Sequence, residues 1–284
     1  MKQFDYYEPS ALDEACTLLM NPNGRAKVLA GGTDLIVQLK EKQIDIDCVI
    51  NLKKIKGLSE VTFDEEKGLR IGALVTWTQI LDCEPVKKHY PILMSAAETM
   101  ASTQVRNVAT LAGNVCHASP AANGSIPLLL YEAECTVQGP NGKRSFPIHE
   151  MFKDVQKNSL RKGEILTDIS TSLPFPGTKG TYYKFAPRKA MDLASVVVGA
   201  LVRVNNGTFH KIRIALGAVA PVPFRARRAE GVLAGQAVTD EIIRKAAETA
   251  AIESAPISDI RASKEYRVEI IKELTFRAIK ECAV

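Results

Sequence analysis

The sequence predicts an α+β protein made of two small α/β lobes and a C-terminal domain with a three-stranded antiparallel sheet and helices. Residues 26–40 read as an apolar strand, a Gly-Gly turn and a helix, which is a βα unit. Residues 60–73 alternate apolar and polar side chains around a Glu-Glu-Lys-Gly turn, a pattern typical of paired strands. Residues 195–219 contain an apolar run, the turn Asn205-Asn206-Gly207 and a second strand, which predicts an antiparallel hairpin. These patterns predict three modules, at residues 1–58, 59–176 and 177–284.

The first lobe is predicted to contain two helices and two strands. A helix over 8–20 starts near Pro9 and Ser10, because apolar side chains recur on one face from Leu12 to Leu19. The βα unit and one short strand complete the lobe, at 26–30, 34–40 and 48–51.

The second lobe combines strands with two helices. Thr76 is a good N-cap, and Trp77 lies on the apolar face of the helix that follows, which favours a core position over contact with a ligand. A second helix is predicted at 91–100. The strands of this lobe are predicted at 60–64, 68–73, 135–139, 143–147 and 164–174.

The third module is predicted to be a sheet covered by helices. Its strand at 195–204 is apolar almost throughout, so both faces should be buried and the strand should be central. The other strands are predicted at 182–185 and 211–219. The helices are predicted at 225–233, 240–254 and 266–279.

Composition excludes several classes of function. The formal charge of +5 is spread along the 284 residues without a cluster of basic and aromatic side chains, so nucleic-acid binding is not expected. The chain starts without an apolar leader and has no run of about 20 apolar residues, which predicts a cytoplasmic protein that does not enter a membrane.

Cysteines and histidines give no sign of a metal centre. The six cysteines are scattered without a Cys-x-x-Cys pair, as is usual for buried, inert thiols, and the four histidines show no paired spacing. We therefore expect neither a metal site nor an iron–sulfur cluster in this chain.

The stretch 101–131 has small residues where an ordinary core segment carries bulky ones. Gly113 leaves room beside the main chain, and several neighbours carry short polar groups, so an anionic, hydrogen-bonding cofactor is expected here. The polar residues are Ser102, Thr103, Thr110, Asn114 and Ser119.

The turn at Gly31-Gly32 is the second candidate for a cofactor site. Backbone N–H groups between a strand and a helix can bind phosphate, although such turns also occur for purely steric reasons. A Gly-x-Gly-x-x-Gly motif is absent, so an ordinary Rossmann site is excluded.

These segments together resemble the FAD-binding medium subunits of molybdenum hydroxylases, most closely those of bacterial xanthine dehydrogenases and also those of nicotinate and carbon monoxide dehydrogenases. The resemblance runs nearly end to end. It rests on AGGTD at 30–34, LRIGA at 69–73 with Thr76, QVRNVATLAGN at 104–114, SPA at 119–121, YKFAPR at 183–188 with Asp192, GAVAP at 217–221 and SDIRASKEYR at 258–267.

The resemblance implies a PCMH-type, vanillyl-alcohol-oxidase-like fold with FAD between the two N-terminal lobes. In such a fold the glycine turn would hold the diphosphate, and Lys184 would lie near the isoalloxazine edge, where a cation raises the reduction potential. Without the resemblance, Lys184 reads as a solvated strand lysine. The implied cofactor-binding residues are Val28, Leu29, Ala30, Gly31, Gly32, Thr33, Asp34, Leu35, Met100, Thr110, Leu111, Ala112, Gly113, Asn114, Asn123, Leu166 and Lys184.

The resemblance also implies partners. FAD would receive electrons from [2Fe-2S] clusters on a small subunit and pass them to NAD, while a large molybdopterin subunit hydroxylates a purine or another N-heterocycle. Relatives suggest a dimer of heterotrimers. No residue of this chain is expected to act as a catalytic acid, base or nucleophile.

Four groups of residues leave more than one interpretation open. Ala112 and Asn123 replace the Gly and Asp of many relatives, which would alter the strength of FAD binding. Cys116 and His117 could suggest a covalent flavin link or a reactive thiol, but plain packing is favoured because no activating partner is evident. Two further sets are interpreted as structural: Arg188 with Asp192 as a local ion pair, and Arg261, Lys264 and Arg267 as structural or partner-contacting residues.

Two other functions compete with an electron-transfer subunit. A self-sufficient flavin oxidoreductase would need a larger cap domain than the third module offers. A cofactor-free assembly module would be consistent with Ala112 and Asn123, and would carry no flavin.

Overall fold

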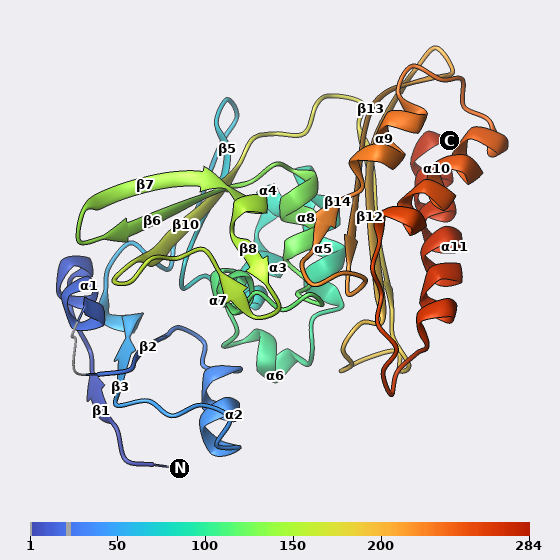
Figure 1. The fold of residues 1–284 in the computed structure, drawn as a ribbon. Coiled ribbons are helices and arrows are strands. Elements are labelled where there is room, and N and C mark those ends of the chain that lie inside the picture. Colours follow the sequence, from blue (N-terminus) through green and yellow to red (C-terminus); the bar gives the residue numbers. More distant parts are fainter. Residues whose placement is uncertain (1, 21–23) are drawn as a thin grey trace.

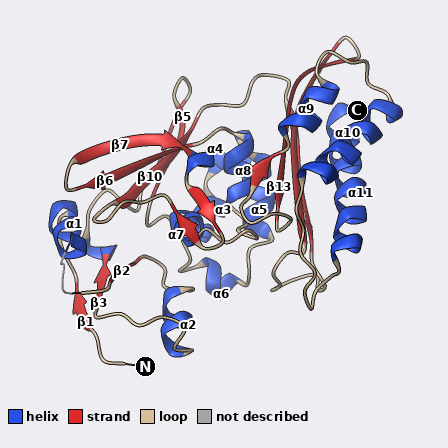
Figure 2. Ribbon diagram, viewed as in Figure 1, coloured by secondary structure: helices blue, strands red, loops and turns tan. Residues whose placement is uncertain are grey.

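The computed structural model describes residues 2–20 and 24–284 of the chain (Figure 1). Helices and strands are mixed through the first two thirds, whereas the C-terminal third places its helices together on one face of a sheet (Figure 2). The predicted α+β class is confirmed. The three larger sheets are formed by residues within 5–51, 61–171 and 179–225, and the module boundaries near 58 and 176 stay predictions.

The N-terminal lobe is built on a three-stranded parallel sheet in the order β1-β3-β2. Strand β1 was not predicted, because its side chains are all exposed and give no apolar alternation. Buried side chains of α1 pack against β3. The elements are β1 (Asp5–Tyr7), α1 (Leu12–Met20), β2 (Ala26–Leu29), α2 (Leu35–Lys40), β3 (Cys48–Asn51) and η1 (Leu52–Lys54).

The second lobe contains a five-stranded antiparallel sheet in the order β4-β5-β10-β6-β7. All five predicted strands form. Their bounds are β4 (Val61–Asp64), β5 (Gly68–Gly72), β6 (Glu134–Gly139), β7 (Gly142–Pro147) and β10 (Ile165–Thr171). A short extra pair and a 3-10 turn lie between β7 and β10, at η2 (Ile148–Glu150), β8 (Phe152–Asp154) and β9 (Lys157–Asn158).

Helices cover this sheet. Thr76 caps α3 in a full capping box with Gln79, and Trp77 is completely buried, so both predictions are confirmed. The stretch rich in small residues forms three short helices, α6 to α8. The helices are α3 (Trp77–Asp82), α4 (Glu84–His89), α5 (Pro91–Glu98), α6 (Thr103–Arg106), α7 (Leu111–His117) and α8 (Ser125–Leu130).

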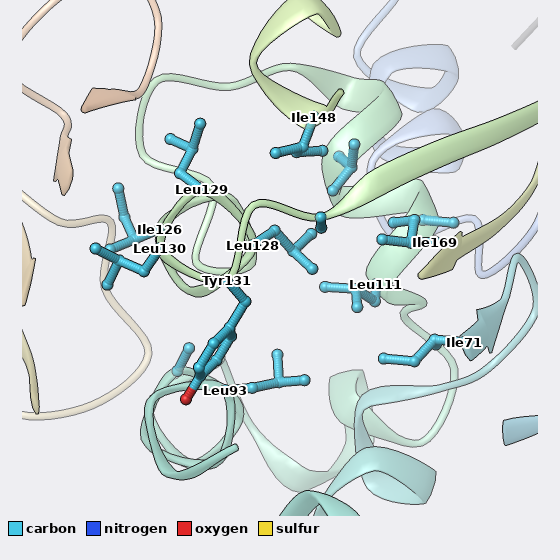
Figure 3. Packing of buried hydrophobic residues seen from close by; sticks show 14 of the residues in the cluster. Ile71, Leu93, Leu111, Ile126, Leu128, Leu129, Leu130, Tyr131, Ile148 and Ile169 are labelled. Carbon is cyan, nitrogen blue, oxygen red and sulfur yellow. The ribbon is translucent and has the colours of Figure 1, made fainter. Parts of the chain in front are cut away.

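Helix α8 lies at the centre of the main core. All six of its residues are buried, which is the pattern of a helix enclosed on every side. Figure 3 shows Leu128 directed towards Leu111, with Ile169 and Ile71 beyond it, while Leu130 lies beside Ile126 on the other side of the helix. The same core cluster therefore includes residues of α7, α8 and the sheet.

The C-terminal domain is an antiparallel sheet in the order β11-β12-β13-β14, covered on its outer face by three helices (Figure 1). The three predicted strands form, and β14 adds a two-residue fourth strand where a helix start was predicted. Strand β12 is central as predicted: Val197 and Leu201 face the second lobe, while Val196 and Val198 face the helices. The elements are β11 (Lys179–Phe185), β12 (Val196–Asn205), β13 (Thr208–Gly217), β14 (Phe224–Arg225), α9 (Arg227–Leu233), α10 (Asp240–Glu253) and α11 (Lys264–Ala283).

An ion-pair network joins this sheet to the end of α8. Arg213 donates to the carbonyl oxygen of Leu130 at 2.7 Å and pairs with Glu132. Arg225 pairs with both Glu132 and the buried Glu230. These contacts hold β13 and β14 against the second lobe.

Candidate functional site

One cleft of about 650 Å³ brings most of the predicted site residues together, within the usual range of roughly 300–1,000 Å³ for ligand sites. One wall is the end of β2, the turn and α2; the other is the start of α7 with the segment that leads into β10. The predicted residues that line it are Val28 to Leu35, Met100, Thr110, Ala112 to Asn114 and Leu166.

The glycine turn is needed first for contact within the protein. A Cβ atom on Gly31 would lie 2.2 Å from the carbonyl oxygen of Val108, so only glycine lets the two walls approach this closely. Gly32 has a φ of 77°, in the left-handed region that favours glycine. The turn thus closes the cleft at its base.

The same turn offers hydrogen-bond donors. The backbone N–H groups of Gly32, Thr33 and Asp34 donate to no acceptor within the described part of the chain. Asp34 stands at the N-cap of α2, but its carboxylate makes no capping hydrogen bond. Adjacent unpaired N–H groups suit an anion such as a diphosphate.

On the opposite wall, short polar side chains mostly satisfy their own backbone. Thr110 accepts the N–H of Gly113 at 3.0 Å and so caps α7, and Ser102 caps α6 in the same way. Asn114 accepts the N–H of Gly124 at 3.0 Å. These hydrogen bonds within the protein explain part of the pattern of short polar residues that suggested a cofactor site in the stretch 101–131.

Three predicted residues do not line the cleft. Leu111 is fully buried in the main core (Figure 3). Asn123 is buried, and its amide donates to the carbonyl oxygen of Ala96 at 3.3 Å and to the hydroxyl of Thr99 at 3.4 Å. The half-buried Lys184 donates to the carbonyl oxygen of Thr99 at 3.0 Å.

Asn123 and Lys184 therefore meet at Thr99, immediately before Met100, which does line the cleft. Burial lowers the pKa of Lys184. Their predicted roles in binding a cofactor stay predictions.

Sequence reasoning missed a charged group at the other end of the cleft. Arg25, Lys27, Arg161 and Lys162 line that end. The pair at 161–162 precedes Gly163, which has a φ of 81°, so a basic turn just before the strand that carries Leu166 was the available signal.

Cys116 lies at the cleft without the features of a reactive thiol. Burial raises its pKa to about 12, so the thiol stays protonated near neutrality, which favours the packing interpretation. His117 has its Nε2 atom 3.7 Å from the carboxylate of Asp34, across the cleft.

Arg188 and Arg267 are held by contacts within the chain. Arg188 pairs with Asp192 at 3.2 Å, as predicted. Arg267 is buried and donates to the carbonyl oxygens of Ser195 and Ala218 and to Asp259.

The described residues offer neither a group of side chains that could hold a metal ion nor a helix that could cross a membrane. No group of three or more His, Cys, Asp or Glu side chains among them could hold a metal ion. No helix in the described ranges is both long enough and apolar enough to cross a membrane.

Comparison with known proteins decides the family. Residues 2–175 match the family described as the FAD binding domain in molybdopterin dehydrogenase, and residues 181–282 match the CO dehydrogenase flavoprotein C-terminal domain. The protein belongs to the FAD-binding subunits of molybdenum hydroxylases. Like its relatives, this FAD-binding subunit is part of an oxidoreductase, and the predicted family is confirmed.

Individual relatives match almost over their whole length. The xanthine dehydrogenase FAD-binding subunit of Escherichia coli O157:H7 is 33% identical over 97% of this chain and 94% of its own. The structure of carbon monoxide dehydrogenase from Hydrogenophaga pseudoflava matches with a TM-score of 0.95 at 29% identity, covering 99% of this chain and 97% of the other. Quinoline 2-oxidoreductase from Pseudomonas putida 86 matches with a TM-score of 0.93 at 29% identity, over 100% and 98% of the two chains.

Proposed function

We propose that this FAD-binding subunit holds FAD in the cleft between its N-terminal lobes and passes electrons from [2Fe-2S] clusters of a small partner subunit to NAD. The observation that carries the proposal is the single cleft that unites the glycine turn, Met100 and the start of α7. Its size, its unpaired N–H groups and its basic end fit a long anionic cofactor.

Each part of the cleft has a task in this proposal. The N–H groups of Gly32 to Asp34 bind the diphosphate. Met100 packs near the flavin, and Leu166 packs against a ring face. Bound FAD supplies a carrier that accepts electrons and releases them singly or as hydride. The chain itself binds and orients the cofactor, and Lys184 places a positive charge beside it.

The substrate belongs to a different chain in this proposal. Relatives named for xanthine and nicotinate support a purine or another N-heterocycle, oxidised at a molybdopterin centre on a large subunit. The three kinds of chain would form a dimer of heterotrimers in the cytoplasm.

Changing Lys184 to Met should lower the two-electron reduction potential of the bound flavin by about 30 mV, equivalent to ~1.4 kcal/mol. A half-buried cation favours the anionic reduced form, and methionine keeps most of the side-chain volume without the charge. The potential is measured by spectroelectrochemical titration. Lys179 to Met is the matched control, because Lys179 is an exposed residue of the same strand; equal shifts in both variants would contradict the role of Lys184.

The proposed function is tested by the visible absorption spectrum of the chain, purified alone and together with its partner subunits. We expect a flavin spectrum from the chain alone, with iron–sulfur absorbance and bleaching by a purine only when the partners are present. Bleaching of the isolated chain by an organic substrate would instead indicate a self-sufficient enzyme, and no flavin in either preparation would indicate an assembly module.

A further inference from the structure

Three segments that are distant in sequence meet at His117, the last residue of α7. Its Nε2 atom lies 3.7 Å from Oδ1 of Asp34 at the glycine turn and 3.4 Å from Nε2 of Gln156 in the turn between β8 and β9. All three residues line the cleft. The imidazole therefore faces the glycine turn from the opposite wall.

Asp34 presents a difficulty for an anion at this turn. Its carboxylate directly follows Gly32 and Thr33, and like charges repel at short range. It does not use this charge to cap α2. Among the residues that the structure describes, His117 is the only basic side chain with a nitrogen within 4 Å of this carboxylate.

We propose that His117 neutralises the carboxylate of Asp34 and so allows the glycine turn to accept the diphosphate of FAD. This inference rests on the proposed function. A cationic imidazole at this position would offer both the Asp34 carboxylate and a bound diphosphate an opposite charge at short range, which offsets the repulsion between the two anions. Gln156 faces the ring without a charge, and the adjacent Cys116 thiol stays protonated, so neither competes for the role.

Two other roles for His117 make different predictions. If the imidazole bound the diphosphate directly, its loss would weaken FAD binding whether or not Asp34 were charged. If it only held the two lobes together, its loss would weaken binding of every flavin, including riboflavin, which has no phosphate.

A double-mutant cycle on the full chain separates these roles. The variants are His117→Gln, Asp34→Asn and the double variant, with dissociation constants measured by flavin fluorescence for FAD and for riboflavin. We expect His117→Gln to weaken FAD binding about five- to tenfold, the effect of one partly buried charge near a helix end. We expect no change for riboflavin, and the double variant should bind FAD as tightly as Asp34→Asn alone.

His149→Gln is the control, because His149 is exposed and lies outside the cleft. Thermal unfolding of each apo variant shows whether the fold is retained. An equal loss for FAD in the presence and absence of the Asp34 charge, an equal loss for riboflavin, or no loss at all would each overturn the inference while the proposed function stands. Failure of the wild-type chain to bind FAD would instead overturn the proposed function.

Discussion

Replacing Gly31 by alanine should weaken FAD binding about 100-fold, or ~2.7 kcal/mol, because the added methyl group meets the backbone of the opposite wall of the cleft. The added Cβ would lie 2.2 Å from the carbonyl oxygen of Val108 and 2.8 Å from Cα of Ala109. Both atoms belong to backbone, which cannot rotate away as a side chain can. The glycine turn must therefore move away from the segment before α7, and the two walls of the cleft separate.

The measurement is the dissociation constant for FAD, with thermal unfolding of the apo chain as a second readout. Overpacking of this kind costs about 1–3 kcal/mol of stability. Gly231 to Ala is the matched control: nothing lies within 4 Å of the added atom, and Gly231 is inside α9, so stability should be unchanged or rise by up to about 1 kcal/mol. FAD binding by the Gly31 variant at wild-type strength would show that the walls can part without disturbing the site.

Gly31 also illustrates what could and could not be predicted about this turn from the sequence. The pattern placed a Gly-Gly turn between a strand and a helix, and the structure has β2 and α2 on either side of it. The identity of the approaching atom was out of reach, because Val108 is distant in sequence and nothing in a local pattern reports a contact across two lobes. The sequence left open whether the turn binds phosphate or has a purely steric reason, and at Gly31 the closest approach is by protein backbone.

Helices and strands could be predicted wherever burial of one or both faces leaves a recognisable apolar pattern in the sequence. Strand β12 could be placed at the centre of its sheet because both of its faces are apolar. Strands β1 and β14 were missed because they are very short, and β1 has no buried face. The helices of the stretch rich in small residues were not foreseen, because α8 is buried on all sides and has no amphipathic pattern.

The candidate site was predictable as a set of segments rather than atom by atom. Helical geometry turns Leu111 into the core while its neighbours Ala112 and Gly113 line the cleft, which a continuous motif cannot distinguish. Lys184 reaches Thr99 through the packing of α5 against β11, and Asn123 reaches it through the packing of α5 against α8, so their common partner could not be found from the sequence.

Changing Arg267 to Met should lower the free energy of unfolding by about 3 kcal/mol, as expected when a buried arginine is removed from two carbonyl oxygens and a partly buried carboxylate. Arg267 is 3% exposed. Its guanidinium donates to the carbonyl oxygen of Ser195 at 2.5 Å, to that of Ala218 at 3.2 Å and to Asp259 at 2.7 Å. The variant leaves two carbonyl groups without this donor at the end of the C-terminal sheet.

Urea unfolding measures this loss. Arg277 to Met is the matched control on the same helix: its pair with Glu273 is exposed, so the change should stay within about 0.5 kcal/mol. Similar losses for both variants would contradict a special role for the buried arginine.

In the Arg267 variant, the free energy of unfolding should also depend less on pH in the acidic range than it does in the wild type. Burial by itself raises the pKa of Asp259, but hydrogen bonds from the Arg261 N–H and from the Arg267 guanidinium outweigh it and lower that pKa to about 2. The unfolded value is about 3.9, so the ionised carboxylate stabilises the fold above about pH 4, and this contribution disappears as the pH falls towards 2. The difference in unfolding free energy between wild type and the Arg267 variant should therefore shrink between pH 5 and pH 3. Of the three groups that accept hydrogen bonds from Arg267, only the Asp259 carboxylate titrates in this range. A difference that stays constant would therefore assign the whole loss to the two carbonyl hydrogen bonds and none to the ion pair.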